Sequence, residues 1–350
     1  MIFPDDERNE EHPDFERLKK IKLAHRERLL NIPHVHGVGI GFRLIDGSYS
    51  DELVIKVFVS HEIPEETAEE AYRIPSSLSV GKETAEVEIE IVGPPTVQVF
   101  RLRSRPLRGG SSIAPLDTSG QDVGVGTLGV CIMMRDQMPY ILSCRHVLMP
   151  PGVQIGARVT QPALTDGGAP QFADVVANVS QAAPVNFTGW NRVDAALAQV
   201  IDGFDVGDRL VHWIGYPSFR PLKKTSGFNS IMKPVAKMGR TTEFTVGMVI
   251  SVSADFEVDW SHVFGNAPRT NLVRFEDQLM IVPPMFSTPG SATIPFSQQG
   301  DSGSLVVDLA SKRPVGMVMA SGSIKRPVNI HSYTLANKIE DIYDSFGIEF

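Results

Sequence analysis

The sequence predicts a mostly β protein in which a small α/β domain precedes two strand-rich regions and a helix closes the chain. Short apolar runs bounded by glycine, proline and polar residues recur between about residues 110 and 330, as they do in barrels and sandwiches. Helical spacing of apolar residues lies near the ends of the chain, over 14–30 and 335–346. A length of 350 residues, 42% of them hydrophobic and 21% charged, suits two globular domains. We therefore expect an N-terminal domain over 1–104 and a second domain over 105–350.

The N-terminal domain is expected to begin with a helix. Residues 1–12 are acidic and poor in apolar residues, so we expect them to be disordered or loosely packed. Asp14 is a candidate N-cap for a helix that runs to about Leu30 and has an apolar face made of Phe15, Leu18, Ile21, Leu29 and Leu30. This face favours packing or contact between copies of the chain, and the alternative is recognition of a partner.

Three strands and a short helix are expected to complete this domain. The strands are predicted at residues 35–42, 53–59 and 85–92, and the helix is predicted after Pro64. In the third strand valine and isoleucine alternate with glutamate, which is typical of a sheet with one face in water.

Glycine recurs at every second position in the first of these strands, at Gly37, Gly39 and Gly41. Dinucleotide-binding loops are also rich in glycine, but here no helix follows and the full glycine spacing is missing. We therefore favour a tight crossing of strands and expect no cofactor. His34 and His36 have no cysteine or carboxylate set at ligand spacing, so no metal site is expected either.

The second domain is expected to hold two barrels, at about 110–205 and about 225–330, after a connection rich in proline, arginine, glycine and serine. Strands are predicted in them at 124–134, 140–143, 173–180, 193–200, 244–252, 278–282, 303–307 and 315–319. Leu335, Ile339, Ile342 and Phe346 have helical spacing ahead of Gly347, and they predict a C-terminal helix over about 335–346.

Three polar residues stand at the ends of predicted strands. His146 follows one apolar strand, Asp194 begins another, and Ser302 lies in the loop Gly300-Asp301-Ser302-Gly303-Ser304. A serine hydroxyl needs a base such as imidazole to attack near neutral pH, and the imidazolium that forms needs a carboxylate beside it. The sequence therefore predicts a His146, Asp194, Ser302 triad, with the amides of Gly300 and Ser302 as an oxyanion hole. Taken singly, each of the three residues could instead have a structural role, as a core histidine, a strand cap and a turn residue.

These segments together resemble the trypsin-like serine peptidases of the chymotrypsin fold, which share the chain order His, Asp, Ser. Within that family the chain most resembles the plant Narrow Leaf-type proteins and their bacterial relatives, which have a small α/β domain ahead of the protease domain. This resemblance is found in the segments Arg105-Pro106-Leu107-Arg108-Gly109-Gly110, Gly126-Thr127-Leu128-Gly129, Gln161-Pro162, Asp166-Gly167-Gly168 and 142–147. It implies a double six-stranded β-barrel and a serine endopeptidase that acts on a protein or peptide through an acyl-enzyme.

The resemblance also implies the place of a substrate pocket. Phe296 would lie at its base, and Met319, Ala320 and Ser321 would line it. None of the four is acidic, so a buried arginine or lysine of the substrate would lose its water without gaining a counter-charge. We predict a small or apolar residue before the scissile bond.

Asp301 raises the question of activation. In many secreted relatives a newly formed N-terminal amine pairs with the corresponding aspartate, whereas here a whole domain precedes it. Asp301 then needs another counter-charge or stays solvated. We expect a regulated protease, latent until a partner meets the N-terminal domain. The alternative is a protease-shaped binding or scaffold protein with little or no catalysis.

Composition excludes several other classes of function. The net charge of −8 argues against nucleic-acid binding, which rests on clustered lysine and arginine. No run of 18 apolar residues occurs, so no membrane span is predicted, and the acidic N-terminus does not resemble a secretory signal. Cys131 and Cys144 are too few for a disulfide framework, and buried free thiols are favoured over a bridge between neighbouring strands. We expect a bacterial, cytoplasmic protein, and the sequence leaves a homo-oligomer open.

Overall fold

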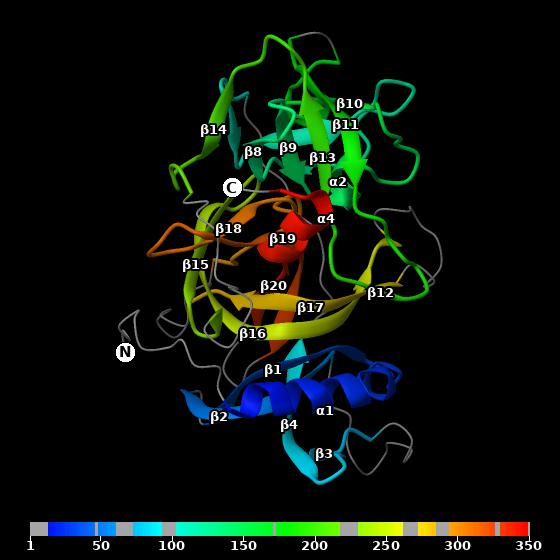
Figure 1. Ribbon diagram of the computed structural model, residues 1–350, viewed down its shortest axis with the longest axis vertical. Helices are drawn as coiled ribbons and strands as arrows, with labels where there is room; N and C mark the ends of the chain where they lie inside the picture. Colours follow the sequence, from blue (N-terminus) through cyan, green and yellow to red (C-terminus); the bar gives the residue numbers. More distant parts are fainter. Residues whose placement is uncertain are drawn as a thin grey trace.

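The computed structural model describes residues 13–45, 48–60, 73–92, 103–170, 173–217, 230–261, 272–284, 294–325 and 330–348. Within them the chain is mostly β and ends in a helix, which confirms the predicted fold class. Figure 1 shows the N-terminal elements at the bottom, the second strand-rich region in the middle and the first at the top. The predicted loose segment 1–12 and the helix after Pro64 lie outside the described residues.

No helix in the described part of the chain is both long and apolar enough to cross a membrane.

The described N-terminal elements are one helix and four strands: α1 (Pro13–Leu30), β1 (Val35–Ile45), β2 (Ser48–Val59), β3 (Ser77–Val80) and β4 (Glu83–Val92). Strand β2 pairs antiparallel with β1 and parallel with β4. The five apolar residues predicted to form the helix face are all buried. They share a hydrophobic cluster with residues of the second barrel such as Val249 and Leu279, so the helix docks onto a common core.

The first strand-rich region is a curled sheet that packs around a second hydrophobic cluster. Its elements are β6 (Ser112–Pro115), β7 (Gly126–Thr127), β8 (Val130–Met133), β9 (Pro139–Ser143), α2 (Arg145–Leu148), β10 (Arg158–Thr160), η2 (Leu164–Asp166), β11 (Val175–Ala182) and β13 (Ala196–Val200). Two further strands, β5 (Leu107–Gly109) and β14 (Val206–Val211), form a parallel pair.

The second region contains six strands that close on themselves. They are β15 (Pro234–Gly239), β16 (Glu243–Asp259), β17 (Leu272–Val282), β18 (Leu305–Asp308), β19 (Pro314–Lys325) and β20 (Ile330–Lys338). The order β17-β20-β19-β18-β15-β16 is completed by a direct pairing of β16 with β17. Closure pairs each strand with two neighbours within the barrel, but the outer parts of the long strands β16 and β19 extend beyond these pairings. The short β12 (Trp190–Asn191) adds to β17.

The N-terminal strands continue this sheet. Strand β1 pairs with β16 beyond the part of β16 that pairs with β15, and the end of β4 pairs with β19. Gly37 lies opposite Phe256, and a Cβ at Gly37 would lie 2.5 Å from that ring. The repeated glycines therefore permit a close approach of strands, in agreement with the interpretation made from the sequence. The sheet reaches eleven described strands because β12 and β1–β4 add to the six strands of the barrel.

The predicted C-terminal helix begins later than expected. Leu335 to Lys338 belong to strand β20, and the helix α4 covers Ile339–Phe346. Leu335 pairs with Met280, and β20 is needed to close the barrel, so sheet pairing outweighs the helical spacing at this end. Gly347 ends the helix in the left-handed conformation at φ 61°, as predicted.

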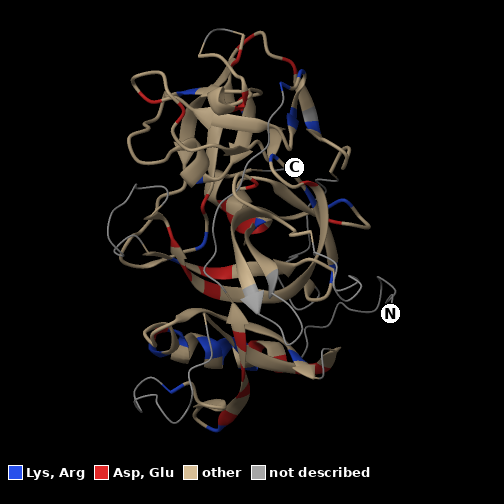
Figure 2. Ribbon diagram, turned by 180° about the vertical axis from the view of Figure 1, so that it is seen from behind, with Lys and Arg blue, Asp and Glu red and all other residues tan. Residues whose placement is uncertain are grey.

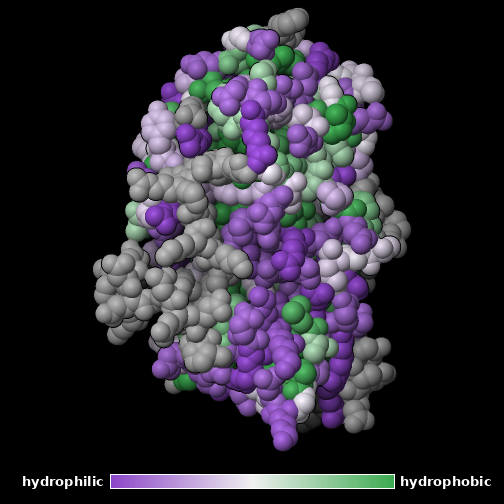
Figure 3. All heavy atoms as spheres, in the orientation of Figure 1, coloured by the Kyte–Doolittle hydropathy of each residue, from purple (hydrophilic) through white to green (hydrophobic). Residues whose placement is uncertain are grey.

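Charge is distributed unevenly around α1. Seen from behind in Figure 2, lysine and arginine lie along the helix, and aspartate and glutamate form bands across the strands next to it. Figure 3 shows a mainly hydrophilic surface over the lower front of the molecule, with scattered hydrophobic residues.

Candidate active site

His146 and Asp194 form a tightly held pair. His146 lies in α2, directly after β9, and Asp194 lies just before β13, which is the neighbour of β9. The backbone N–H of His146 donates to Asp194 Oδ1 at 3.0 Å, and the Nδ1 of the imidazole bonds to Oδ2. Both side chains are buried. The Nε2 of His146 has no hydrogen-bond partner among the described residues, so it is the nitrogen left to accept a proton.

Asp194 is itself fixed from the second barrel. Its backbone N–H donates to Asn337 Oδ1 at 2.9 Å. The Nδ2 of Asn337 donates to Gln278 Oε1 at 2.6 Å, and all three residues are 0% exposed. A buried amide pair of this kind has few alternative partners, so it holds the carboxylate in one place.

The loop that carries Ser302 requires glycine at the next position, 303. Gly303 has φ 93°, and a Cβ there would lie 2.1 Å from Ser143 Oγ and 2.3 Å from the Thr127 carbonyl. The hydroxyl of Ser302 donates to the Met319 carbonyl at 3.0 Å. Catalysis would therefore require this hydroxyl to turn from β19 toward the imidazole.

Thr127 joins the nucleophile loop to the first barrel. Its N–H donates to the Ser302 carbonyl at 2.8 Å, and its hydroxyl donates to the Gly300 carbonyl at 2.7 Å. Its own carbonyl accepts the Ser143 hydroxyl at 2.7 Å, at the end of the strand that precedes His146. Thr127 thus links the serine and the histidine from opposite barrels. Because it is fully buried, these bonds do not compete with water.

Lys237 of β15 supplies the counter-charge that Asp301 needs. Lys237 Nζ lies 3.2 Å from Asp301 Oδ2, and both residues are 0% exposed. Burial lowers the pKa of Lys237, and the charge of Asp301 opposes that shift. Asp301 also accepts from the N–H of Thr241 at 2.8 Å and from the hydroxyl of Thr242 at 2.6 Å. The residue between Gly300 and Ser302 is therefore held without any N-terminal amine.

The thiol of Cys144 lies beside the pair. The donor atoms of Cys144, His146 and Asp194 all lie within 4.8 Å of one another, a spacing that could hold a metal ion. The thiol however donates to the Val318 carbonyl at 3.1 Å, and burial, followed by the charge of Asp194, raises its pKa well above the ordinary value. A thiol that stays protonated is a poor metal ligand, so the chemistry of this set favours the histidine–carboxylate pair. Cys131 and Cys144 are both buried and unbridged.

One aromatic ring lies beside the imidazole, and two others pack against that ring. The Trp260 ring, 3% exposed, lies 5.9 Å from the His146 ring and 5.9 Å from Phe275. Phe187 meets Trp260 edge-on at 6.4 Å and is 53% exposed. These rings limit the access of water to one side of the histidine.

The residues predicted to form the substrate pocket lie in two places. Met319, Ala320 and Ser321 are buried on β19, and Met319 accepts the Ser302 hydroxyl. Phe296 is 0% exposed and packs into the cluster that also holds the α1 residues. The pocket with Phe296 at its base stays a prediction.

Three supporting residues escaped the sequence analysis: Thr127, Lys237 and Asn337. Thr127 and Lys237 lie in glycine-containing segments that stand out in the sequence, but nothing local indicates their partners. Asn337 lies in a segment that has helical spacing, and its contact with Asp194 spans 143 residues.

No protein-family model matches the chain, and no curated protein sequence matches it. Among solved structures, Thermobifida fusca protease A matches 69% of this chain and 95% of its own length, with 13% identity and a TM-score of 0.41. A Nocardiopsis protease overlaps 69% and 96%, with 14% identity and a TM-score of 0.40. A glutamic acid-specific serine protease overlaps 69% and 98%, with 16% identity and a TM-score of 0.42. These three structural neighbours are proteases, and the third is a serine protease.

Proposed function

We propose that this chain is a serine endopeptidase that hydrolyses peptide bonds through an acyl-enzyme on Ser302. The observation that carries the proposal is the His146–Asp194 pair. The Asp194 carboxylate accepts a hydrogen bond from the backbone N–H of His146 and bonds to its Nδ1, and the Nε2 is left without a partner among the described residues. This is the arrangement that a general base for a serine hydroxyl needs.

The proposed reaction uses only groups of the chain, the peptide and water. Ser302 Oγ attacks the carbonyl carbon of the peptide while its proton passes to His146 Nε2, and Asp194 balances the imidazolium. The amides of Gly300 and Ser302 would hold the oxyanion. The C–N bond then breaks as the imidazolium gives its proton to the leaving amine, and water releases the acyl group by the same steps. No cofactor enters this sequence.

Several finer features belong to the same proposal. The division at residues 104 and 105 follows from the length and composition of the chain. The relationship to the Narrow Leaf-type proteins and the pocket around Phe296 and Met319 follow from the sequence resemblance. A reducing, cytoplasmic location is supported by the two unbridged cysteines. The substrate would be a protein or peptide with a small or apolar residue before the scissile bond.

A latent resting state is favoured by one observation. The Ser302 hydroxyl donates to the Met319 carbonyl at 3.0 Å, which occupies the proton that His146 would accept. Activation would then consist of turning this hydroxyl, with the triad otherwise in place. Stronger labelling of Ser302 in cell lysate than in purified protein would support latency, and equal labelling would contradict it.

A fluorophosphonate probe tests the proposed activity. Wild-type protein should be labelled, Ser302→Ala should not, and Asp194→Asn should react about 10⁴-fold more slowly, because the histidine loses its orienting charge. Ser311→Ala is the matched control, since Ser311 is exposed and its hydroxyl bonds to Asp308 at 2.6 Å. Equal labelling of wild type and Ser302→Ala would remove the proposal. A folded wild type that never reacts would favour the scaffold alternative.

A further inference from the structure

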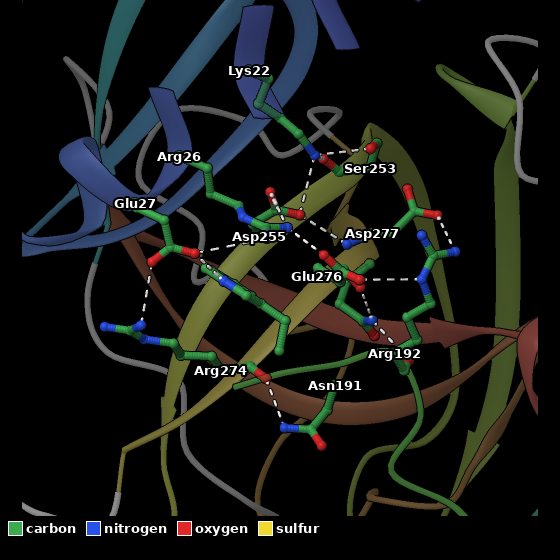
Figure 4. Close-up of polar contacts among 12 residues, drawn as sticks. Lys22, Arg26, Glu27, Asn191, Arg192, Ser253, Asp255, Arg274, Glu276 and Asp277 are labelled. Atoms are coloured by element: carbon green, nitrogen blue, oxygen red, sulfur yellow. Dashed lines mark hydrogen bonds and ion pairs between the residues drawn. The ribbon is translucent and has the colours of Figure 1, made fainter. Parts of the chain in front are cut away.

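Helix α1 buries charged side chains against the second barrel. Lys22 is 1% exposed, and its Nζ lies 3.1 Å from Asp255 Oδ1 and 2.9 Å from Ser253 Oγ on β16. Arg26, one turn later, pairs with Asp255 Oδ2 at 3.5 Å and with Glu276 on β17. Figure 4 shows both side chains reaching from α1 to these strands. The apolar face of α1 could dock without such contacts, so the buried charges need a separate explanation.

The acidic residues are presented by irregular backbone. Ser253 has φ 56° and Asp277 has φ 61°, values that residues other than glycine rarely adopt. The register between β16 and β17 shifts on both sides of Ala254, which marks bulges in the two strands. The Asp277 N–H donates to Asp255 Oδ1 at 2.8 Å. The bulges therefore bring the carboxylates of neighbouring strands together beneath α1.

Arg192 extends this set of contacts toward Asp194. Its Nε lies 3.2 Å from Glu276 Oε1, and its Nη1 lies 3.5 Å from Asp277 Oδ2. Glu276 thus contacts both Arg26 of the helix and Arg192, which lies two residues before Asp194. Asp277 also pairs with Lys338 at 2.8 Å, beside Asn337.

Two buried amides complete the connection to the triad. Gln278 Nε2 donates to the Arg192 carbonyl at 2.9 Å, and Gln278 Oε1 accepts from Asn337. Asn337 Oδ1 then accepts the N–H of Asp194 at 2.9 Å. An unbroken series of direct contacts therefore runs from the side chain of Arg26 to the residue that holds His146.

Burying these charges costs desolvation energy, which argues that the fixed geometry of the charged pairs has a role. Burial lowers the pKa of Lys22 and raises the pKa of Asp255, and each shift is opposed by the charge of the other residue. Apolar residues of similar size could dock a helix with less desolvation. Charged pairs with fixed geometry instead specify one register of α1 on the bulges.

We propose that α1 is a positioning element of the active site, in which Lys22 and Arg26 fix the acidic cluster that holds Arg192 and so set the place of Asp194 beside His146. The inference rests on the proposed function. It gives the N-terminal elements a role in the reaction: a partner that displaced α1 would lower activity without touching the triad.

Variants at both ends of the cluster test this inference. Arg26→Met removes the contact of α1 with Glu276, and Arg192→Met removes the last side chain of the cluster at a position that is 55% exposed. Each should lower the rate of Ser302 labelling by roughly 10- to 100-fold, because a small displacement of a catalytic group is costly. Each should also shift the proton resonance of the Nδ1–H of His146, which reports the bond to Asp194. Lys20→Met is the control, since Lys20 lies on the same helix and pairs with exposed Glu83 at 2.7 Å.

Folding is checked in each variant by circular dichroism and thermal unfolding, and Arg192→Met keeps the test open if Arg26→Met does not fold. Folded Arg192→Met protein with the labelling rate and the His146 resonance of wild type would overturn the inference. A Lys20→Met protein whose labelling rate and His146 resonance changed as much as those of the other variants would also overturn it. If wild-type protein is never labelled, the proposed function fails, and the resonance still decides whether the cluster positions Asp194.

Discussion

At the scale of single residues, the pairing of Lys237 with Asp301 determines the shape of the loop that carries Ser302, the proposed nucleophile. The carboxylate contacts the ammonium group at 3.2 Å and also accepts bonds from Thr241, Thr242 and the N–H of Gln298 at 3.0 Å. These bonds tie the loop to the turn after β15. Removing one partner of such a pair leaves a charge without solvent, which is far more costly than removing both.

Lys237→Met should therefore destabilise the protein by about 3–5 kcal/mol and abolish labelling of Ser302. Urea unfolding measures the first effect, and the probe measures the second. Lys312→Met is the control, because Lys312 is exposed. The double variant Lys237→Met with Asp301→Asn should recover part of the lost stability. If Asp301→Asn lowers the stability of the Lys237→Met protein as much as it lowers that of wild type, the two residues do not act as a pair.

The contact between His146 and Asp194 agrees with the sequence analysis, whereas a triad that includes Ser302 stays a prediction. The three residues could be selected from the sequence because each lies in a short, self-contained motif. The glycines around Ser302 and the apolar strand before His146 are local signals. Asn337 gives no such signal, since its role exists only when β20 lies next to β17. The same limit explains the error at Leu335, which has helical spacing with Ile339 but lies in β20 together with residues 336–338. Local periodicity does not report which strands must meet to close a barrel.

At the scale of elements, α4 contains a carboxylate in an unfavourable place. Asp341 lies in the first turn of the helix, and its Oδ2 is buried without a hydrogen-bond partner among the described residues. Burial raises the pKa of Asp341 to about 6; Asp277 and Glu340 add to the shift, and Lys338 and Arg192 oppose it. The folded state therefore binds a proton more tightly than the unfolded chain does.

This shift predicts the direction of a pH effect. Stability contributed by protonated Asp341 should be fully present below about pH 4 and be lost as the pH rises through about 6. Asp341→Asn should remove that loss, so its melting temperature should exceed that of wild type at pH 7 and match it at pH 4. Asp344→Asn, exposed on the same helix, is the control. Parallel melting curves for wild type and Asp341→Asn across this range would contradict the assignment.

At the scale of the whole molecule, the N-terminal elements and the second barrel share one sheet and one hydrophobic cluster. The sequence indicated the strands of both parts, but it could not indicate that β1 pairs with β16. Edge pairing depends on which backbone groups remain free after the barrel closes, and no residue of β1 encodes that by itself. The shared sheet predicts that the two parts unfold together.

Two tryptophans can report this cooperativity separately. The Arg26 guanidinium lies 3.8 Å from the centre of the Trp190 ring, so Trp190 senses the docking of α1, whereas Trp260 lies against His146. Proteins retaining only Trp190 or only Trp260 should show the same urea midpoint by fluorescence. A Trp190 signal that changes at lower urea, while Trp260 keeps its native emission, would show that α1 separates from the barrel first.

The close packing of Gly37 against Phe256 limits which N-terminal segments from other proteins could replace that of this chain. A transplanted leading segment would have to supply a strand with glycine opposite that ring, since a side chain there would collide with it at 2.5 Å. Without such a strand, the outer border of β16 would be left open to pairing with another chain. Exchange of modules between homologues should therefore succeed only when the donor and the recipient carry this glycine and aromatic residue as a matched set.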